Sequence, residues 1–213
     1  MRLINGIKRR IKCLLQFGET WWRSHPAAIA IKTKLGIPAR FHSPARSVLE
    51  DSIIPYYVSK GPKSRMLFVG IDWYTKHYEK FFKHYEAYWT IDPDPSQKRY
   101  GGKNHIVDYF ENMNQYFEPE YFDVIICNGV LGHGINDRDA VEKALGVCFS
   151  YMRPGGTFVL GWGGTPGLLS FPLEESKSLR QFAPFEFPPL GTANYSTKPQ
   201  YQYIFQFFQK PAD

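Results

Sequence analysis

Asp92 is the residue of this 213-residue sequence whose type and position point most directly to a bound ligand. It follows the apolar run from Tyr88 to Ile91, and it lies 22 residues after Gly70, which ends an earlier apolar run. A carboxylate about 20 residues after a first glycine turn can accept hydrogen bonds from ribose hydroxyls at its two oxygens. An Asx turn before Pro93 is the alternative, since a short aspartate also bonds its own backbone. From the residues alone, both interpretations of Asp92 stay open.

His133 is the candidate general base, because it lies between Gly132 and Gly134 in a loop after the apolar run Tyr121–Cys127. Histidine changes its protonation near neutral pH, which suits removal of a proton from a hydroxyl or an amine. A solvated loop histidine without a chemical role is the alternative. The sequence contains no HxH, HExxH or Cys/His cluster, so we expect no metal site.

The loop after Gly70 restricts the kind of cofactor. Gly70 is followed by Ile71-Asp72-Trp73-Tyr74-Thr75, without the further glycines that let a backbone approach a pyrophosphate. A pyrophosphate would meet the carboxylate of Asp72 instead, so NAD and FAD are disfavoured. A nucleoside without phosphates, with a positively charged end near Asp72, fits this loop.

Apolar runs alternate with helical patterns from residue 65 onward. The predicted strands are Met66–Val69, Tyr88–Ile91, Asn104–Val107, Tyr121–Cys127 and Thr157–Leu160. Helices are predicted over Tyr74–Tyr85 and from a cap at Asn136 or Asp137 to Met152, with a hairpin strand over Tyr201–Gln209. This order predicts an α/β fold, a mostly parallel Rossmann-like sheet with helices on both faces and a C-terminal antiparallel hairpin. Ligands bind such sheets where the strands end.

Over residues 65–165 the sequence resembles the class I S-adenosylmethionine-dependent methyltransferases. The resemblance rests on LFVG, YWTIDPD, HIVDYF, FDVIICNGVLGHG and YMRPGGTFVLGWG, the successive strands with their following loops. The last two strings are the most specific, since the family often combines an "fDvi" strand with a later Pro-Gly-Gly lead. The first glycine motif is degenerate here and is reduced to Gly70.

The resemblance implies an enzyme that moves a methyl group from S-adenosylmethionine to a small-molecule acceptor. It implies the following cofactor contacts: Gly70 and Asp72 with the methionine portion, Asp92 with the ribose, Asp108 and Tyr109 with the adenine, and Asn128 and Gly129 at the mouth where methyl transfer occurs. Two other classes stay open. A metal-dependent sugar-nucleotide transferase would use Asp92-Pro93-Asp94 as an acid-x-acid site, and a non-catalytic Rossmann-like protein would only bind a partner.

The net charge of +6 is unevenly distributed. Residues 1–40 hold nine basic residues and one acidic residue, which leaves 17 basic and 19 acidic residues in 41–213. The body is therefore nearly neutral, which argues against a nucleic acid as partner. We divide the chain into a basic N-terminal extension over 1–60, an amphipathic helix followed by an irregular segment, and a methyltransferase-like domain over 61–213.

The amphipathic helix is expected within residues 1–17. Its apolar positions recur at helical spacing, with basic residues between them: Leu3, Ile4, Ile7, Ile11, Leu14 and Leu15. Such a helix fits peripheral contact with an anionic membrane surface through residues 1–40. The alternative is that the apolar stripe packs on the domain or on a second subunit. The sequence assigns no oligomeric state.

Cysteine usage bears on the compartment. Cys13, Cys127 and Cys148 are odd in number and lack CxxC spacing, so we expect no disulfide framework. A reducing, cytoplasmic location is favoured. No apolar run reaches the length that spans a bilayer.

Overall fold

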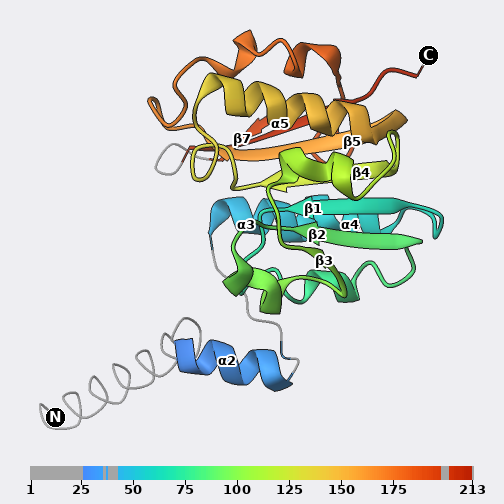
Figure 1. Ribbon diagram of the computed structural model, residues 1–213, viewed down its shortest axis with the longest axis vertical. Coiled ribbons are helices and arrows are strands. Elements are labelled where there is room, and N and C mark those ends of the chain that lie inside the picture. The colour runs from blue at the N-terminus through green and yellow to red at the C-terminus, as the bar shows by residue number, and fades with distance from the viewer. Residues whose placement is uncertain (1–25, 36, 38–42, 198–201, 213) are drawn as a thin grey trace, which may run out of the picture.

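The computed structural model describes residues 26–35, 37, 43–197 and 202–212 (Figure 1). These residues form an eight-stranded sheet in the order β3-β2-β1-β4-β5-β8-β6, with β7 paired to β8. The strands are β1 (Arg65–Val69), β2 (Ala87–Ile91), β3 (Asn104–Ile106), β4 (Phe122–Asn128), β5 (Met152–Gly163), β6 (Ala183–Pro184), β7 (Asn194–Ser196) and β8 (Tyr203–Gln209). β1 to β5 pair in parallel, and β8 runs antiparallel to its partners. The predicted fold class is confirmed.

The strand register brings the predicted ligand-binding positions to one edge of the sheet. Val69 at the end of β1 pairs with Ile91 of β2 and with Cys127 of β4. The residues that follow these three are Gly70, Asp92 and Asn128, so they lie side by side at the carboxyl ends of the strands. β4 is buried along its whole length, which explains its unbroken apolar sequence.

Helix α5 (Arg138–Tyr151) covers one face of the sheet (Figure 1). Asp137 caps its start by accepting a hydrogen bond from the amide of Ala140 at 2.9 Å, which selects Asp137 from the two predicted caps. Its buried side chains are Val141, Ala144, Leu145, Cys148 and Tyr151. They pack in one cluster with Leu67, Ile125 and Phe158 of the sheet.

A continuous helical segment covers the opposite face. It consists of α3 (Pro44–Val48), a π-helical turn η1 (Leu49–Ile53) and α4 (Ile54–Val58). Leu49, Ile53, Ile54 and Tyr57 are at most 2% exposed and cluster with Met66 and Phe68 of β1. These residues fall within the predicted extension over 1–60, yet they pack into the core beside β1. Their apolar positions at helical spacing are the signal that assigns them to the domain.

Two other segments differ from the predictions. Pro26–Leu35 is a helix, α2, within the stretch expected to be irregular, and it begins at a proline, which suits a first helical turn. The predicted helix over Tyr74–Tyr85 is a series of tight turns with one 3-10 helix, η2 (Tyr78–Lys80). Its backbone bonds run from residue i to i−3, as from Tyr78 to Thr75 and from Phe81 to Tyr78. The buried aromatic residues recur at three- and four-residue spacing, which mimics an α-helical pattern.

The remaining helices are short 3-10 turns: η3 (Pro95–Tyr100), η4 (Phe110–Gln115), η5 (Leu173–Glu175) and η6 (Leu179–Gln181). None of the helices in the described part of the chain has the length and apolarity needed to cross a bilayer. The amphipathic helix predicted within 1–17 lies outside the described residues.

Candidate active site

A cavity of about 320 Å³ opens at the carboxyl ends of β1, β2 and β4, and we call it the strand-end cavity. All eight predicted site residues line it: Gly70, Asp72, Asp92, Asp108, Tyr109, Asn128, Gly129 and His133. The parallel register explains this convergence, because residues that follow neighbouring parallel strands meet at one edge. The roles assigned to these residues stay predictions.

Gly70 allows the ends of β1 and β4 to approach closely. Its φ is +86°, and a Cβ at this position would overlap the carbonyl oxygen of Asn128. Any other residue would therefore strain the backbone and push the two strand ends apart. Gly70, the glycine that remains from the degenerate motif, is thus required by the local packing.

The carboxylates of the strand-end cavity are held in different ways. Asp92 is half-buried, and its Oδ1 accepts a hydrogen bond from the amide of Asp94 at 3.0 Å. Burial raises the pKa of Asp92, and amide hydrogen bonds from Asp94 and Ile71 only partly offset this effect. Asp92 thus makes the Asx turn and also lines the cavity. The two interpretations of its sequence position are compatible.

Asp72 and Asp108 lie in the loops after β1 and β3. Asp72 Oδ1 accepts a hydrogen bond from the amide of Trp73 at 2.6 Å. Asp108 accepts hydrogen bonds from the Asn112 side chain and the Tyr116 hydroxyl, both at 2.8 Å, and these partners lower its pKa. Tyr109 beside it is 58% exposed. Asp108 therefore braces the turn that leads into η4 while it lines the cavity.

The electrostatic character of the strand-end cavity favours a ligand without phosphate. Asp72, Asp92, Asp108 and Glu111 line it, and the described lining residues include no lysine or arginine. Negative wall charges repel phosphates and attract a positively charged group. Val69, Ile91, Phe110 and Ile135 add an apolar wall suited to a base. These residues fit a nucleoside that carries a positive charge, as expected of S-adenosylmethionine.

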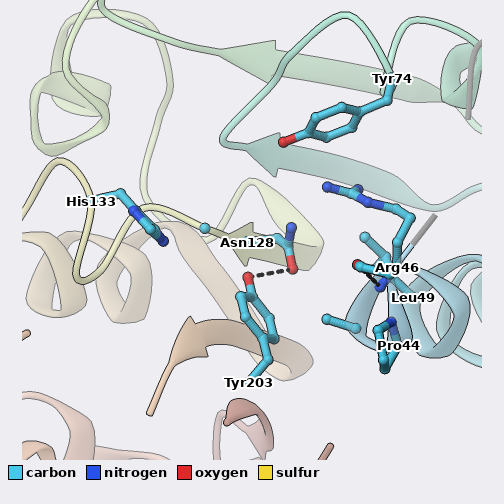
Figure 2. A pocket seen from close by; sticks show the side chains of 10 residues that line it. Pro44, Arg46, Leu49, Tyr74, Asn128, His133 and Tyr203 are labelled. Atoms are coloured by element: carbon cyan, nitrogen blue, oxygen red, sulfur yellow. Dashed lines mark hydrogen bonds between the residues drawn. The ribbon is translucent and has the colours of Figure 1, made fainter. Parts of the chain in front are cut away.

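A second cavity, of about 600 Å³, adjoins the first on the side of α3, and we call it the helix-side cavity. Tyr74, Asn128, Gly129 and His133 line both cavities, so the two cavities meet at these residues. Asn128 is held by Tyr203 of β8, whose hydroxyl donates to Asn128 Oδ1 at 3.0 Å (Figure 2). Gly161 of β5 leaves room for this amide, since a Cβ there would overlap Asn128 Oδ1.

The far wall of the helix-side cavity is formed by α3 and η1. Arg46 is buried, and its Nη1 donates to the Tyr78 hydroxyl at 2.9 Å. Its guanidinium carbon lies 4.1 Å from the centre of the Tyr74 ring. His133 is exposed and lies across the cavity from Arg46 (Figure 2).

Sequence reasoning missed Arg46, Tyr74 and Tyr203 as cavity residues. Tyr203 lies in a predicted strand, but only the antiparallel pairing of Gly163 with Tyr203 shows which of its residues reaches the site. Arg46 lies within 1–60, the predicted N-terminal extension. For Tyr74 the signal was its place in the loop after the first strand.

Metal chemistry finds no support in the arrangement of the side chains. Within the described residues, no group of three or more His, Cys, Asp or Glu could hold a metal ion. The Asp94 side chain is exposed and accepts hydrogen bonds from Ser96, and it does not line the strand-end cavity with Asp92. Cys127 and Cys148 are buried free thiols, and burial raises the pKa of Cys127 to about 12. The paired acidic site of a sugar-nucleotide transferase is therefore not favoured.

Residues 69–160 match a family model described as a methyltransferase domain. These residues contain all eight predicted site residues. Among curated protein sequences, none matches the chain at a significant level.

Solved methyltransferase structures share the fold. The N-methyltransferase NodS from Bradyrhizobium japonicum WM9 has a TM-score of 0.58 at 18% identity, over 79% of this chain and 98% of that chain. The 1,6-didemethyltoxoflavin-N1-methyltransferase from Burkholderia thailandensis has a TM-score of 0.55 at 14% identity, over 95% of this chain and 90% of that chain. It was solved with 1,6-didemethyltoxoflavin and S-adenosylhomocysteine. A TehB-like S-adenosylmethionine-dependent methyltransferase from Corynebacterium glutamicum has a TM-score of 0.55 at 17% identity, over 87% of this chain and 100% of that chain.

Proposed function

We propose that the chain is a class I S-adenosylmethionine-dependent methyltransferase, in which the strand-end cavity binds S-adenosylmethionine and the helix-side cavity binds a small-molecule acceptor. The observation that carries the proposal is that the two cavities meet at shared lining residues, Asn128 and Gly129 among them. A methyl group held at this junction from the strand-end cavity can contact a nucleophile held in the helix-side cavity.

The chain's own residues supply binding, orientation and exclusion of water. When bound, S-adenosylmethionine would supply a methyl group on a positively charged sulfur: a lone pair of the acceptor would form a bond to the methyl carbon as the carbon–sulfur bond breaks and its electrons return to sulfur. Asp92 accepts hydrogen bonds from the ribose hydroxyls. Asp108 and Tyr109 flank the base, and Gly70 and Asp72 lie at the amino-acid end. Holding the two reactants in contact and in line at the junction of the cavities lowers the barrier without a catalytic dyad.

His133 is proposed to take the proton that the acceptor loses. It lines both cavities, so its imidazole can reach an acceptor atom at their junction. Leu49 and Pro44 give the opposite wall an apolar surface against which an acceptor can pack. The toxoflavin enzyme supports the choice of a small acceptor, because that protein of the same fold was solved with a small molecule of this kind.

We also propose a cytoplasmic location with peripheral membrane contact through residues 1–40. The basic charge of that segment and the free, buried thiols of Cys127 and Cys148 support this proposal. Neither a nucleic acid partner nor a particular oligomeric state forms part of it.

Calorimetric titration tests the proposed function. S-adenosylhomocysteine and S-adenosylmethionine should bind with a stoichiometry of one per chain, and a nucleotide sugar with Mn²⁺ should not bind. Release of S-adenosylhomocysteine from S-adenosylmethionine in the presence of a panel of small amines, phenols and acids should then identify acceptors. Binding of the nucleotide sugar in place of both adenosyl compounds would refute the proposal.

A further inference from the structure

Arg46 is a buried cation at the wall of the helix-side cavity. Only 9% of the residue is exposed. Arginine is rarely buried to this degree unless it is paired, because removal of its charge from water is costly. The contacts of Arg46 should therefore show what compensates the charge.

Those contacts are neutral. The Nη1 group donates to the Tyr78 hydroxyl at 2.9 Å, and the guanidinium lies over the Tyr74 ring. In the part of the chain that the structure describes, no ion pair joins Arg46 to a carboxylate. Glu50 is connected only indirectly, since the Tyr78 hydroxyl donates to its Oε1 at 2.8 Å. The positive charge is thus stabilised by a ring and a hydroxyl.

The guanidinium faces the helix-side cavity with donors to spare. Arginine has five N–H groups in a planar fork, and within the described residues the Arg46 side chain makes its hydrogen bonds and its ring contact only with the side chains of Tyr78 and Tyr74, which cannot occupy all five. Figure 2 shows the guanidinium between Tyr74 and Asn128, pointing into the cavity. A planar anionic group of two or more oxygens matches such a fork.

The two cavities carry opposite charges. Aspartate and glutamate are absent from the described lining of the helix-side cavity, whereas four carboxylates line the strand-end cavity. An anion entering from solvent is therefore attracted to the helix-side cavity and repelled by its neighbour. Leu49, Pro44 and the Tyr74 ring provide an apolar surface for the rest of the molecule.

We propose that the acceptor carries an oxyanion, a carboxylate or a phosphate, that pairs with Arg46. This proposal rests on the proposed function, since the bound anion is an acceptor only if the protein transfers a methyl group. It adds the chemical class of the substrate. The anionic group binds at the α3 side, and the nucleophile lies at the opposite wall, near Asn128 and His133. Arg46 therefore selects the acceptor and sets its orientation.

Benzoate, phenyl phosphate and neutral benzamide are suitable probes, since benzoate and benzamide have nearly the same shape. Their affinities are measured by ligand-detected NMR titration of the full chain, with and without S-adenosylhomocysteine. At least one anion should bind about tenfold or more tightly than benzamide, and comparison of the two anions identifies the favoured group. Equal affinity of all three, or no binding of either anion, would overturn the proposal.

Variants locate the effect at Arg46. Arg46→Gln should abolish the preference for the anion and leave benzamide binding unchanged, and Arg46→Lys should retain part of it. Arg99→Gln is the matched control, because Arg99 lies over the ring of Tyr100 but is exposed and lines neither cavity. An anion affinity that survives both substitutions at Arg46 in folded protein would place the anion elsewhere.

The two proposals fail in distinguishable ways. If S-adenosylhomocysteine does not bind, the proposed function is wrong, yet the probe titrations without it still decide whether Arg46 holds an anion. If S-adenosylhomocysteine binds and the probes show no anion preference, only the substrate class is wrong.

Discussion

The carboxylate of Asp92 illustrates how one residue can serve both the fold and a ligand. Its turn with Asp94 fixes the side chain at the end of β2, and the strand-end cavity opens beside it. Burial raises the pKa of Asp92, and the nearby charges of Asp94 and Asp72 act in the same direction. A group whose folded pKa is raised takes up a proton more readily in the folded state, so its ionisation costs stability above that pKa. Hydrogen bonds from ribose hydroxyls would recover part of this cost.

Asp92→Ala should weaken S-adenosylhomocysteine binding by about 1.5–3 kcal/mol, about ten- to a hundredfold, because a charge-assisted acceptor is lost. The wild-type affinity should also fall in acid, starting at a higher pH than an ordinary aspartate would give, since protonation removes the same acceptor. The variant should lack this pH dependence. Calorimetry from pH 7 to pH 4 measures both effects.

Asp94→Ala is the control for Asp92, since its side chain is exposed and lies outside the cavity lining. It should retain wild-type affinity at pH 7. An unchanged dissociation constant in folded Asp92→Ala would show that Asp92 does not bind the ribose.

His133 provides the second test at this scale. His133→Ala should lower the turnover rate by roughly 10²- to 10⁴-fold if a general base is lost, and it should leave S-adenosylhomocysteine affinity unchanged. The measurement is the initial rate of S-adenosylhomocysteine release with an acceptor found in the panel. Full turnover of His133→Ala would leave catalysis to orientation alone.

At the scale of the elements, the site residues at the strand ends could be predicted and the residues that support them could not. Gly70, Asp92 and Asn128 each follow an apolar run, and the rule for parallel sheets places them at one edge. The contact of Tyr203 with Asn128 joins residues 75 positions apart and depends on the register of β8 against β5. Arg46 depends on the docking of α3 on the sheet. Such long-range contacts leave no local signature in the sequence.

The same limit applies to the segment after β1. Tyr78, Phe82 and Tyr85 are buried, which produces a helical spacing of apolar residues. The backbone nevertheless forms consecutive i to i−3 turns. An α-helix and a series of i to i−3 turns both bury residues at three- and four-residue spacing, so periodicity alone cannot distinguish the two.

Helix α5 is connected to the segment that contains η5 and η6 through Glu142. Its Oε2 accepts hydrogen bonds from the amide of Ser178 and from the hydroxyl of Ser176, and its Oε1 accepts one from the amide of Lys177. Burial alone would raise the pKa of Glu142, but these hydrogen bonds outweigh it and lower the pKa to about 2. The folded state thus favours the ionised form.

Glu142→Gln should lower the melting temperature at pH 7 by a few degrees, since the change removes a charged acceptor worth roughly 1–2 kcal/mol after allowance for its partial exposure. A depressed pKa adds stability above the unfolded value near 4.3, and this stability is lost as pH falls towards 2. The difference in melting temperature between wild type and variant should therefore shrink between pH 5 and pH 3. Thermal unfolding followed by circular dichroism measures it.

Glu174→Gln is the control for Glu142, because Glu174 is an exposed glutamate in the same segment. It should shift the melting temperature little at either pH. A wild-type and Glu142→Gln difference that stays constant from pH 5 to pH 3 would show that Glu142 acts by packing alone.

At the scale of the whole molecule, the chain separates into a basic N-terminal part and a nearly neutral body, and the packing shows where the body begins. Residues 1–40 carry nine basic residues and one acidic residue. Leu49, Ile53, Ile54 and Tyr57 belong instead to the core cluster that covers β1. The boundary between an extension and the domain should therefore lie before Ser43, the cap of α3, and nearer to residue 40 than to residue 60.

Two truncations test this boundary. Deletion of residues 1–40 should leave the melting temperature and the S-adenosylhomocysteine affinity close to those of the full chain. Deletion of residues 1–58 should unfold the domain, because it removes four buried apolar side chains that each contribute about 1.5–3 kcal/mol, a sum comparable with the whole stability of a domain.

The full chain should also sediment with anionic vesicles, since basic side chains near such a surface contribute about 1 kcal/mol each. The variant that lacks residues 1–40 should not sediment with them. Added salt should weaken this binding by screening. If the 1–40 deletion unfolds or loses S-adenosylhomocysteine while the full chain ignores vesicles, the N-terminal segment packs on the domain or on a second subunit and has no membrane role.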